Sequence, residues 1–85
     1  MSRVLTMHRK IVPPQERKNY FDRLRAKRDY YKRANCTFWA FEEDGLPGAF
    51  LEFFEAPDAS TLTAAHAGAP EPIVDPRRIY KLVEL

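Results

Sequence analysis

Two histidines and one glutamate are the side chains of this chain that could carry acid–base chemistry. His66 follows two alanines, His8 lies in an apolar N-terminal stretch, and Glu52 stands between Phe50 and Phe54. A neutral imidazole can accept a proton from an acidic phenol or ligate a metal. A carboxylate among aromatic rings has its pKa raised by desolvation unless a cation meets it. The sequence therefore offers His66 or His8 as a base and Glu52 as the residue that orients it.

Each of these residues also has a structural interpretation. His66 could face solvent at the end of a helix, where the helix dipole favours it. His8 could be hydrogen-bonded at a subunit interface. Glu52 could pair with a cation of a neighbouring strand, which would be Arg9, Lys10 or Lys81.

A further set of side chains could bind a ligand. Aromatic rings stack on aromatic ligands, and an arginine pair could hold an anionic substituent at a pocket mouth. The aromatic candidates are Trp39, Phe38, Phe41, Phe50 and Tyr80, and the arginines are Arg77 and Arg78. Alternatively, the aromatics form core and interface and the arginines are exposed. Cys36 is the single cysteine and no Cys/His cluster occurs, so we expect a buried, inert thiol, no disulfide and no metal.

Length and charge bound the class of protein. Eighty-five residues make one small domain, residues 1–85, which is marginal without a partner. We expect no secretory leader and no membrane association, because no stretch approaches the ~18 apolar residues of a span; a cytoplasmic location follows. Residues 15–34 carry eight basic and three acidic side chains, and residues 35–85 carry three basic and nine acidic ones. The basic block could bind phosphate, or it could be a solvated helix face.

The central element is an aromatic hairpin between Phe38 and Phe54. Two apolar runs flank a turn that contains Asp44-Gly45 and Pro47-Gly48, residues typical of chain reversals. Along a strand, side chains alternate between faces. Trp39 and Phe41 therefore point one way and Phe38 the other, and both faces of the hairpin need cover.

The remaining elements give the order β-α-β-β-α-β. The expected strands are residues 3–12, 37–43, 49–55 and 79–85, the helices are 15–34 and 59–67, and a proline-rich loop spans 68–76. In the first strand, the face of Leu5, Met7 and Ile11 is the clear core face. In the first helix, Arg28 interrupts an apolar stripe and must snorkel or find a carboxylate. Asp58 is the expected N-cap of the second helix.

This order predicts an α+β fold, a ferredoxin-like two-layer sandwich. In that fold the first and third strands are central and both helices pack on one face of the sheet. The other face must then expose one aromatic set, either that of Phe38, Phe50 and Phe54 or that of Trp39, Phe41 and Leu51. Because such a patch marks an interface or a ligand site, we predict a homodimer with two sheets face to face.

The chain resembles the dimeric α+β barrel superfamily, and within it the antibiotic-biosynthesis-monooxygenase-like proteins. The resemblance covers nearly the whole chain. It rests on the element order, the aromatic hairpin, a strand ending Phe53-Phe54-Glu55, an Asp-capped helix with Ala64-Ala65-His66-Ala67, and a final apolar strand. The resemblance implies a barrel made of two subunits, with a pocket between sheet and helices or inside the barrel.

Members of that superfamily differ in activity. Some oxidise aromatic substrates with dioxygen and without cofactor, and some degrade haem with a helix histidine as ligand. His66 could match that histidine, but Trp39 lies on the second strand and the first strand has no asparagine. The favoured hypothesis is therefore cofactor-free oxidation of an aromatic small molecule, and the alternative is a non-catalytic small-molecule-binding or assembly module.

RNA binding is a rival from another class. Ferredoxin-like sheets can stack bases on aromatics of the third strand, and Ala49-Phe50-Leu51-Glu52-Phe53 fits the tail of that motif. Its basic residue, glycine and first aromatic would fall on Leu46, Pro47 and Gly48, and the acidic turn beside them would repel phosphate. We therefore expect no nucleic-acid partner.

Overall fold

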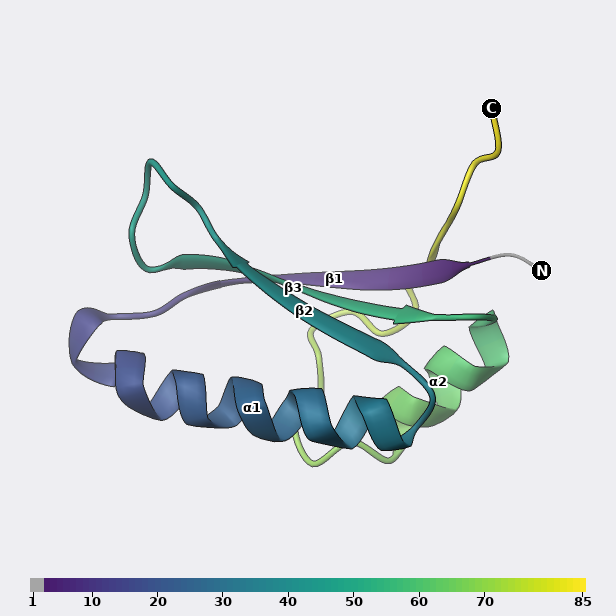
Figure 1. The fold of residues 1–85 in the computed structure, drawn as a ribbon, viewed down its shortest axis with the longest axis horizontal. Coiled ribbons are helices and arrows are strands. Elements are labelled where there is room, and N and C mark those ends of the chain that lie inside the picture. The colour runs from purple at the N-terminus through teal and green to yellow at the C-terminus, as the bar shows by residue number, and fades with distance from the viewer. Residues whose placement is uncertain (1–2) are drawn as a thin grey trace.

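The computed structural model describes residues 3–85 as a four-stranded antiparallel sheet with two α-helices on one face (Figure 1). The elements are β1 (Val4–Ile11), the 3₁₀ turn η1 (Pro14–Glu16), α1 (Arg17–Arg33), β2 (Thr37–Glu42), β3 (Ala49–Ala56), α2 (Ala59–Ala67) and β4 (Tyr80–Lys81). The strand order is β2-β3-β1-β4, so β1 and β3 are central. This confirms the predicted α+β, ferredoxin-like sandwich.

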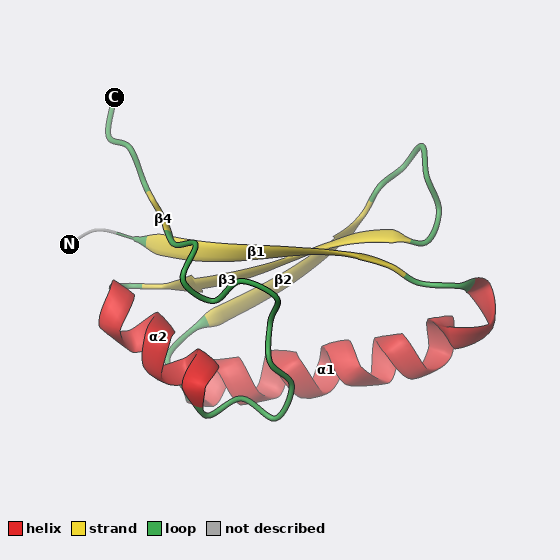
Figure 2. Ribbon diagram, turned by 180° about the vertical axis from the view of Figure 1, so that it is seen from behind, coloured by secondary structure: helices red, strands yellow, loops and turns green. Residues whose placement is uncertain are grey.

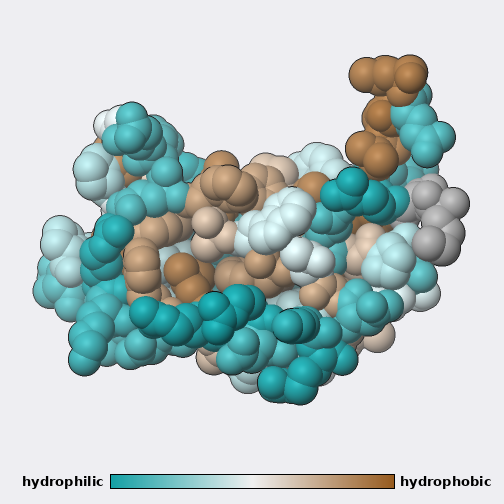
Figure 3. Space-filling model, viewed as in Figure 1, coloured by the Kyte–Doolittle hydropathy of each residue, from teal (hydrophilic) through white to brown (hydrophobic). Residues whose placement is uncertain are grey.

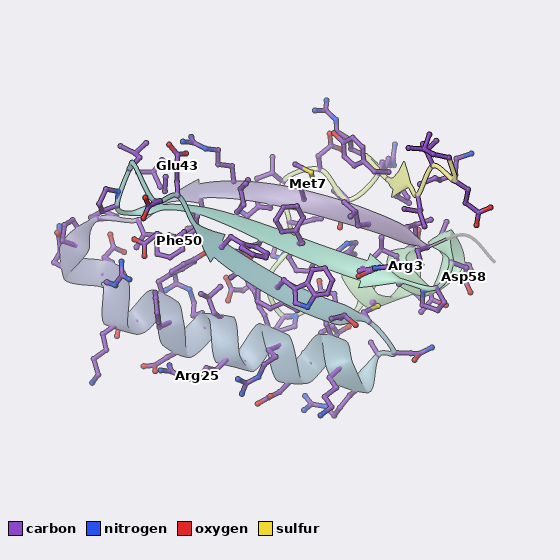
Figure 4. All side chains as sticks on the ribbon, turned by 45° about the horizontal axis from the view of Figure 1, so that its top comes forward. Arg3, Met7, Arg25, Glu43, Phe50 and Asp58 are labelled. Atoms are coloured by element: carbon purple, nitrogen blue, oxygen red, sulfur yellow. The ribbon has the colours of Figure 1, made fainter. Side chains whose placement is uncertain are left out.

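The register divides the sheet into two faces. On the face that the helices cover, cross-strand rows run Phe38–Phe54–Thr6, Ala40–Glu52–His8 and Glu42–Phe50–Lys10. On the other, which we call the open face, rows run Thr37–Glu55–Leu5–Tyr80, Trp39–Phe53–Met7 and Phe41–Leu51–Arg9. Figure 4 shows Met7 on the side of the sheet away from α1. The predicted opposition of Phe38 to Trp39 and Phe41 is confirmed.

The core lies between the sheet and the helices. Phe54 and Leu62 are fully buried there, and Tyr20 and Tyr31 extend from α1 toward the sheet. The Tyr31 ring lies 4.8 Å from that of Phe54, and the Tyr20 ring 4.8 Å from that of Phe50. Burial of such rings is the main stabilising contribution in a domain of this size.

Local signals fix the ends of the elements. Pro14 opens the turn that leads into α1, and Asn35 ends α1 with a left-handed φ of 63°. The Asp58 side chain accepts a hydrogen bond from Thr61 N at 2.8 Å and so caps α2, as predicted. α2 then runs from Ala59 to Ala67, the predicted range, and its residue His66 is buried.

Three details differ from the sequence-based expectations. The core face of β1 is that of Val4 and Thr6, while Met7 and Ile11 are 42% and 59% exposed on the open face. The expectation was wrong because alternation shows which residues share a face, whereas the side on which the helices pack shows which face is buried. The charged residue within the buried stripe of α1 is Lys27, and Arg28 instead lies on the surface beside Asp29.

The third difference is the last strand. We predicted a strand over residues 79–85, but β4 spans only Tyr80–Lys81, paired with Leu5 and Val4. Before β4, the chain from α2 runs as a loop beneath the sheet (Figure 2), where Ile73 is buried. None of the helices in residues 3–85 combines the length and apolarity that crossing a bilayer requires.

Candidate functional site

A buried polar cluster joins the centre of β3 to α1. Glu52 is fully buried, and its carboxylate accepts hydrogen bonds from Tyr20 OH at 2.6 Å and Lys27 Nζ at 2.9 Å. Burial first, and then the Glu52 carboxylate, raises the pKa of the Tyr20 phenol, which keeps it protonated as a donor. Both carboxylate oxygens thus have a protein partner.

The cation that meets Glu52 comes from the helix and not from a neighbouring strand. Arg9 lies on the opposite face of the sheet and approaches Glu43, and Lys10 lies over the Tyr20 ring. The sequence does contain a signal for Lys27. Tyr20, Leu24, Lys27 and Tyr31 follow the spacing of four, three and four residues of a buried helix stripe.

A second cluster surrounds His66. Its Nε2 lies 2.8 Å from Thr6 Oγ1, and its Nδ1 lies 2.8 Å from Tyr31 OH. His66 is 9% exposed, and its ring makes T-shaped contacts with the rings of Tyr31 and Phe54. Burial lowers the pKa of His66, so the neutral imidazole is favoured. The expectation that the residue faces solvent at a helix end is therefore wrong.

This geometry limits what His66 and Glu52 can do. Each ring nitrogen of His66 and each oxygen of Glu52 is within hydrogen-bonding distance of a protein group. Both residues are also buried. A substrate would have to displace Thr6 or Tyr31 to reach His66, and Tyr20 or Lys27 to reach Glu52. The two residues also belong to separate clusters, so the arrangement does not join His66 and Glu52 as a base and its orienting residue.

His8 has a different environment. It is the cross-strand neighbour of Glu52 and is partly exposed. Burial lowers the pKa of His8, partly opposed by the negative charge of Glu52. The imidazole therefore favours its neutral form, which is the form that accepts a proton.

His8 and Tyr80 line a shared groove at the edge of β1. The groove has a volume of about 480 Å³ and is lined by Met7, His8, Arg9, Leu51, Val74, Asp75, Arg78 and Tyr80. It exists because β4 pairs with β1 only at Val4 and Leu5, so the chain before β4 diverges from the middle of β1. The groove is thus lined by one candidate base, His8, and one candidate aromatic residue, Tyr80. Glu52 is the cross-strand neighbour of His8.

The other predicted ligand-binding residues are dispersed. Phe38 and Phe50 are buried in the core, where they contact Phe54 and Tyr20. Trp39 and Phe41 are exposed on the open face at the opposite edge from Tyr80. Arg77 is exposed in the loop before β4, and Arg78 pairs with Asp75 at 3.3 Å. Cys36 is buried, which raises the pKa of its thiol.

The described residues contain no group of three or more metal-binding side chains close enough to hold an ion. His8 is the candidate base that lines this groove, and the hydroxyl of Tyr80 and the guanidinium of Arg78 are further polar groups there.

Comparison with known proteins relates the chain to others by fold. No protein-family model matches the sequence, and no curated protein matches it. Among solved structures, Rv0793 from Mycobacterium tuberculosis superposes with a TM-score of 0.61 at 16% identity, over 100% of this chain and 96% of that one. At this identity the likeness concerns the fold, a small α+β domain.

Proposed function

We propose that the protein works as a homodimer whose two sheets meet at their open faces and enclose a site for an aromatic small molecule. The observation that carries the proposal is the apolar open face. Met7, Trp39 and Phe41 are 42%, 45% and 57% exposed, and no element of residues 3–85 covers them. Exposed apolar surface of this kind marks an interface in a small protein.

The composition of the open face supports self-association. Its central row, Trp39–Phe53–Met7, is entirely apolar, and the Phe41 and Phe53 rings pack edge to face at 5.6 Å. Ion pairs lie around this row: Arg9 with Glu43 and Arg3 with Glu55. An apolar centre with a charged rim is the arrangement of stable interfaces. The dimeric α+β barrels that the sequence resembles close in this way.

The groove beside His8 is the binding site within this proposal. Met7 and Leu51 give it an apolar wall, and Tyr80 offers an aromatic ring and a hydroxyl. Met7 and Tyr80 belong to the open face, so a partner sheet would cover that wall of the groove, while His8 reaches the groove at the edge of β1 from the helix-covered face.

Light scattering across a concentration series tests the homodimer. We expect twice the mass of 9.9 kDa for the parent protein. Phe41→Lys should weaken association by more than about a hundredfold, because the dimer would lose two buried phenyl rings. Ala26→Lys, at an exposed position of α1, is the control and should leave the mass unchanged. A parent protein that stays monomeric at micromolar concentration rejects the proposal.

Binding is tested with 2-naphthol, a planar phenol, titrated against the parent dimer by calorimetry. Tyr80→Ala should reduce the affinity because it removes one wall of the groove. Ala26→Lys is again the control. Equal affinity of parent and Tyr80→Ala would place binding outside this groove.

Oxidation of the bound aromatic by dioxygen is the second candidate function. It is favoured by the half-buried, neutral His8 in the groove, in contrast to the fully hydrogen-bonded His66 and Glu52. His8 would take a proton from a phenol or an activated methylene, and the anion would react with dioxygen. For a methylene the balance is CH₂ + O₂ → C=O + H₂O.

His8→Gln tests the oxidation. Product formation with dioxygen should fall by about 10²-fold or more if His8 is the base. His66→Gln should lower activity only through stability, because both nitrogens of His66 already have protein partners. Unchanged turnover after substitution of both histidines by Ala would reject the acid–base mechanism.

A further inference from the structure

We propose that the groove beside His8 binds an aromatic carboxylate, with the ring against Tyr80 and the carboxylate held by Arg9 and Arg78. This inference rests on the proposed small-molecule site and names the chemical class of its ligand. The groove is the one of about 480 Å³ at the edge of β1, a volume within the range of small-molecule sites.

The charged side chains of the groove favour an anion. Arg9 comes from β1 and Arg78 from the loop before β4, and both line the groove. Asp75 is the one acidic residue among the lining residues, and the imidazole of His8 favours its neutral form. Two positive charges therefore face one negative charge. A ligand with a single negative charge would balance the site.

Both arginines keep donors for a ligand. Arg9 Nη2 lies 3.6 Å from Glu43 Oε1, and Arg78 Nε lies 3.3 Å from Asp75 Oδ2. Strong charge-assisted hydrogen bonds are shorter, at about 2.7–2.9 Å. The two arginine side chains are 52% and 70% exposed, so a ligand can reach them. A carboxylate can accept two parallel hydrogen bonds from one guanidinium, which a phenol cannot do.

The rest of the groove suits the ring of such a ligand. Its apolar lining residues are Met7, Leu51 and Val74. Tyr80 pairs with Leu5, and Arg9 lies four residues further along β1, at about 13 Å. Met7 lies between them on the same face of the strand. A flat ring can therefore lie over Met7 beside Tyr80, with its carboxylate directed toward Arg9.

The combination of cations and apolar surface distinguishes this groove from the basic helix. Residues 15–34 carry eight basic side chains, and Figure 3 shows the surface along α1 as largely hydrophilic. Cations on such a surface are hydrated and offer little to an aromatic ring. In the groove the two arginines border an apolar wall and a tyrosine ring, so one ligand can use both.

Calorimetry at pH 7 with 2-naphthoate and 2-naphthamide tests the charge of the ligand. The two compounds have nearly the same shape, and only the acid is ionised. The parent protein should bind 2-naphthoate at least about fivefold more tightly, because only a carboxylate pairs with the guanidinium groups. Raising the salt concentration from about 0.05 M to about 0.5 M should reduce this preference.

Two adjacent arginines provide a matched pair of variants. Arg78→Gln and Arg77→Gln each remove one positive charge from the same loop, but only Arg78 lines the groove. Arg78→Gln should weaken 2-naphthoate binding by about three- to tenfold and leave 2-naphthamide binding unchanged. Arg9→Gln should have the same effect. Arg77→Gln is the control and should change the affinity for neither compound.

The outcomes separate this inference from the proposed function. Equal affinity of the parent for acid and amide, or equal losses in Arg78→Gln and Arg77→Gln, overturns the aromatic carboxylate. Binding of 2-naphthol that is weakened by Tyr80→Ala would then leave the proposed site standing. If the parent binds none of the three compounds, both proposals are rejected.

Discussion

Lys27 and Glu52 form a buried ion pair at the centre of this small domain. The ammonium group is 2.9 Å from the carboxylate, and the side chains are 10% and 0% exposed. Such a pair gives little net stability, because desolvation of the two charges offsets their attraction. Removal of one partner, however, leaves a buried charge without compensation. At the residue scale the pair therefore acts as a constraint on which substitutions the interior tolerates.

Lys27→Met should destabilise the protein by about 3 kcal/mol, because Glu52 would keep only Tyr20 as a donor. The double variant Lys27→Met/Glu52→Gln should be less destabilised than Lys27→Met alone, since no buried charge remains. Urea unfolding of the parent, both single variants and the double variant measures the coupling. Strictly additive effects would contradict the ion-pair interpretation.

His66 should make stability depend on pH above the range in which carboxylates titrate. Burial lowers its folded-state pKa below the unfolded value of about 6.5, so the unfolded chain binds more protons. The contribution of His66 to the free energy of unfolding should therefore be fully present above about pH 6.5. It should be lost on acidification, by at most about 1.4 kcal/mol per pH unit for one group.

Unfolding of the parent and of His66→Gln between pH 7.5 and 5.5 measures this dependence, and the variant should show the smaller slope. His8→Gln is the comparison, because burial lowers the pKa of His8 as well. A slope that disappears in His8→Gln but persists in His66→Gln would assign the effect to His8.

At the scale of elements, the β2–β3 hairpin depends on one of its two glycines. Gly48 has φ of 94°, and a Cβ there would lie 2.8 Å from Val12 O. Its N–H donates to Glu42 Oε2 at 2.9 Å, and Arg17 binds the same carboxylate, so the hairpin is tied to the start of α1. Gly45 has open space around it.

Gly48→Ala should therefore cost about 2 kcal/mol or more, from the left-handed backbone and the contact with Val12 O. Gly45→Ala is the matched control and should change stability little, because nothing lies within 4 Å of the added methyl group. Thermal unfolding of both variants gives the comparison. Equal losses in the two would show that the conformation of Gly48 is not needed.

At the scale of the whole molecule, one face of the sheet is covered within the subunit and the other is not. One face is closed by the helices and filled with aromatic rings, and the other exposes Trp39, Phe41 and Met7. If the open face is covered by a second copy, folding and association are linked.

The unfolding temperature should then rise with protein concentration, and the rise should be absent in Phe41→Lys. Trp39 is the single tryptophan, and its exposed ring gives a second readout. Its emission should shift to shorter wavelength as the concentration increases and the ring leaves water. A melting temperature independent of concentration over a hundredfold range would contradict linked folding and association.

Most of the fold could be predicted from the sequence because its signals are local. The Asp58 cap and Gly68 fix the ends of α2, Pro14 fixes the approach to α1, and alternation separates Phe38 from Trp39. The last strand could not be predicted from its apolar pattern. The observed strand, Tyr80–Lys81, is set by its register with Leu5 and Val4, and that register is a property of segments far apart in the sequence.

In the candidate site, too, local sequence signals identify the residue types, whereas contacts between distant segments identify their partners. The residue types show which side chains carry acid–base groups, and the spacing of Phe50 and Phe54 shows that Glu52 lies among aromatic rings. The packing of the helices on the sheet brings Lys27 to Glu52 and Thr6 and Tyr31 to His66, and the course of the chain before β4 gives His8 a groove. Side-chain types and periodicity are written in short stretches of sequence, whereas a partner 25 to 60 residues away is chosen by how the helices lie on the sheet.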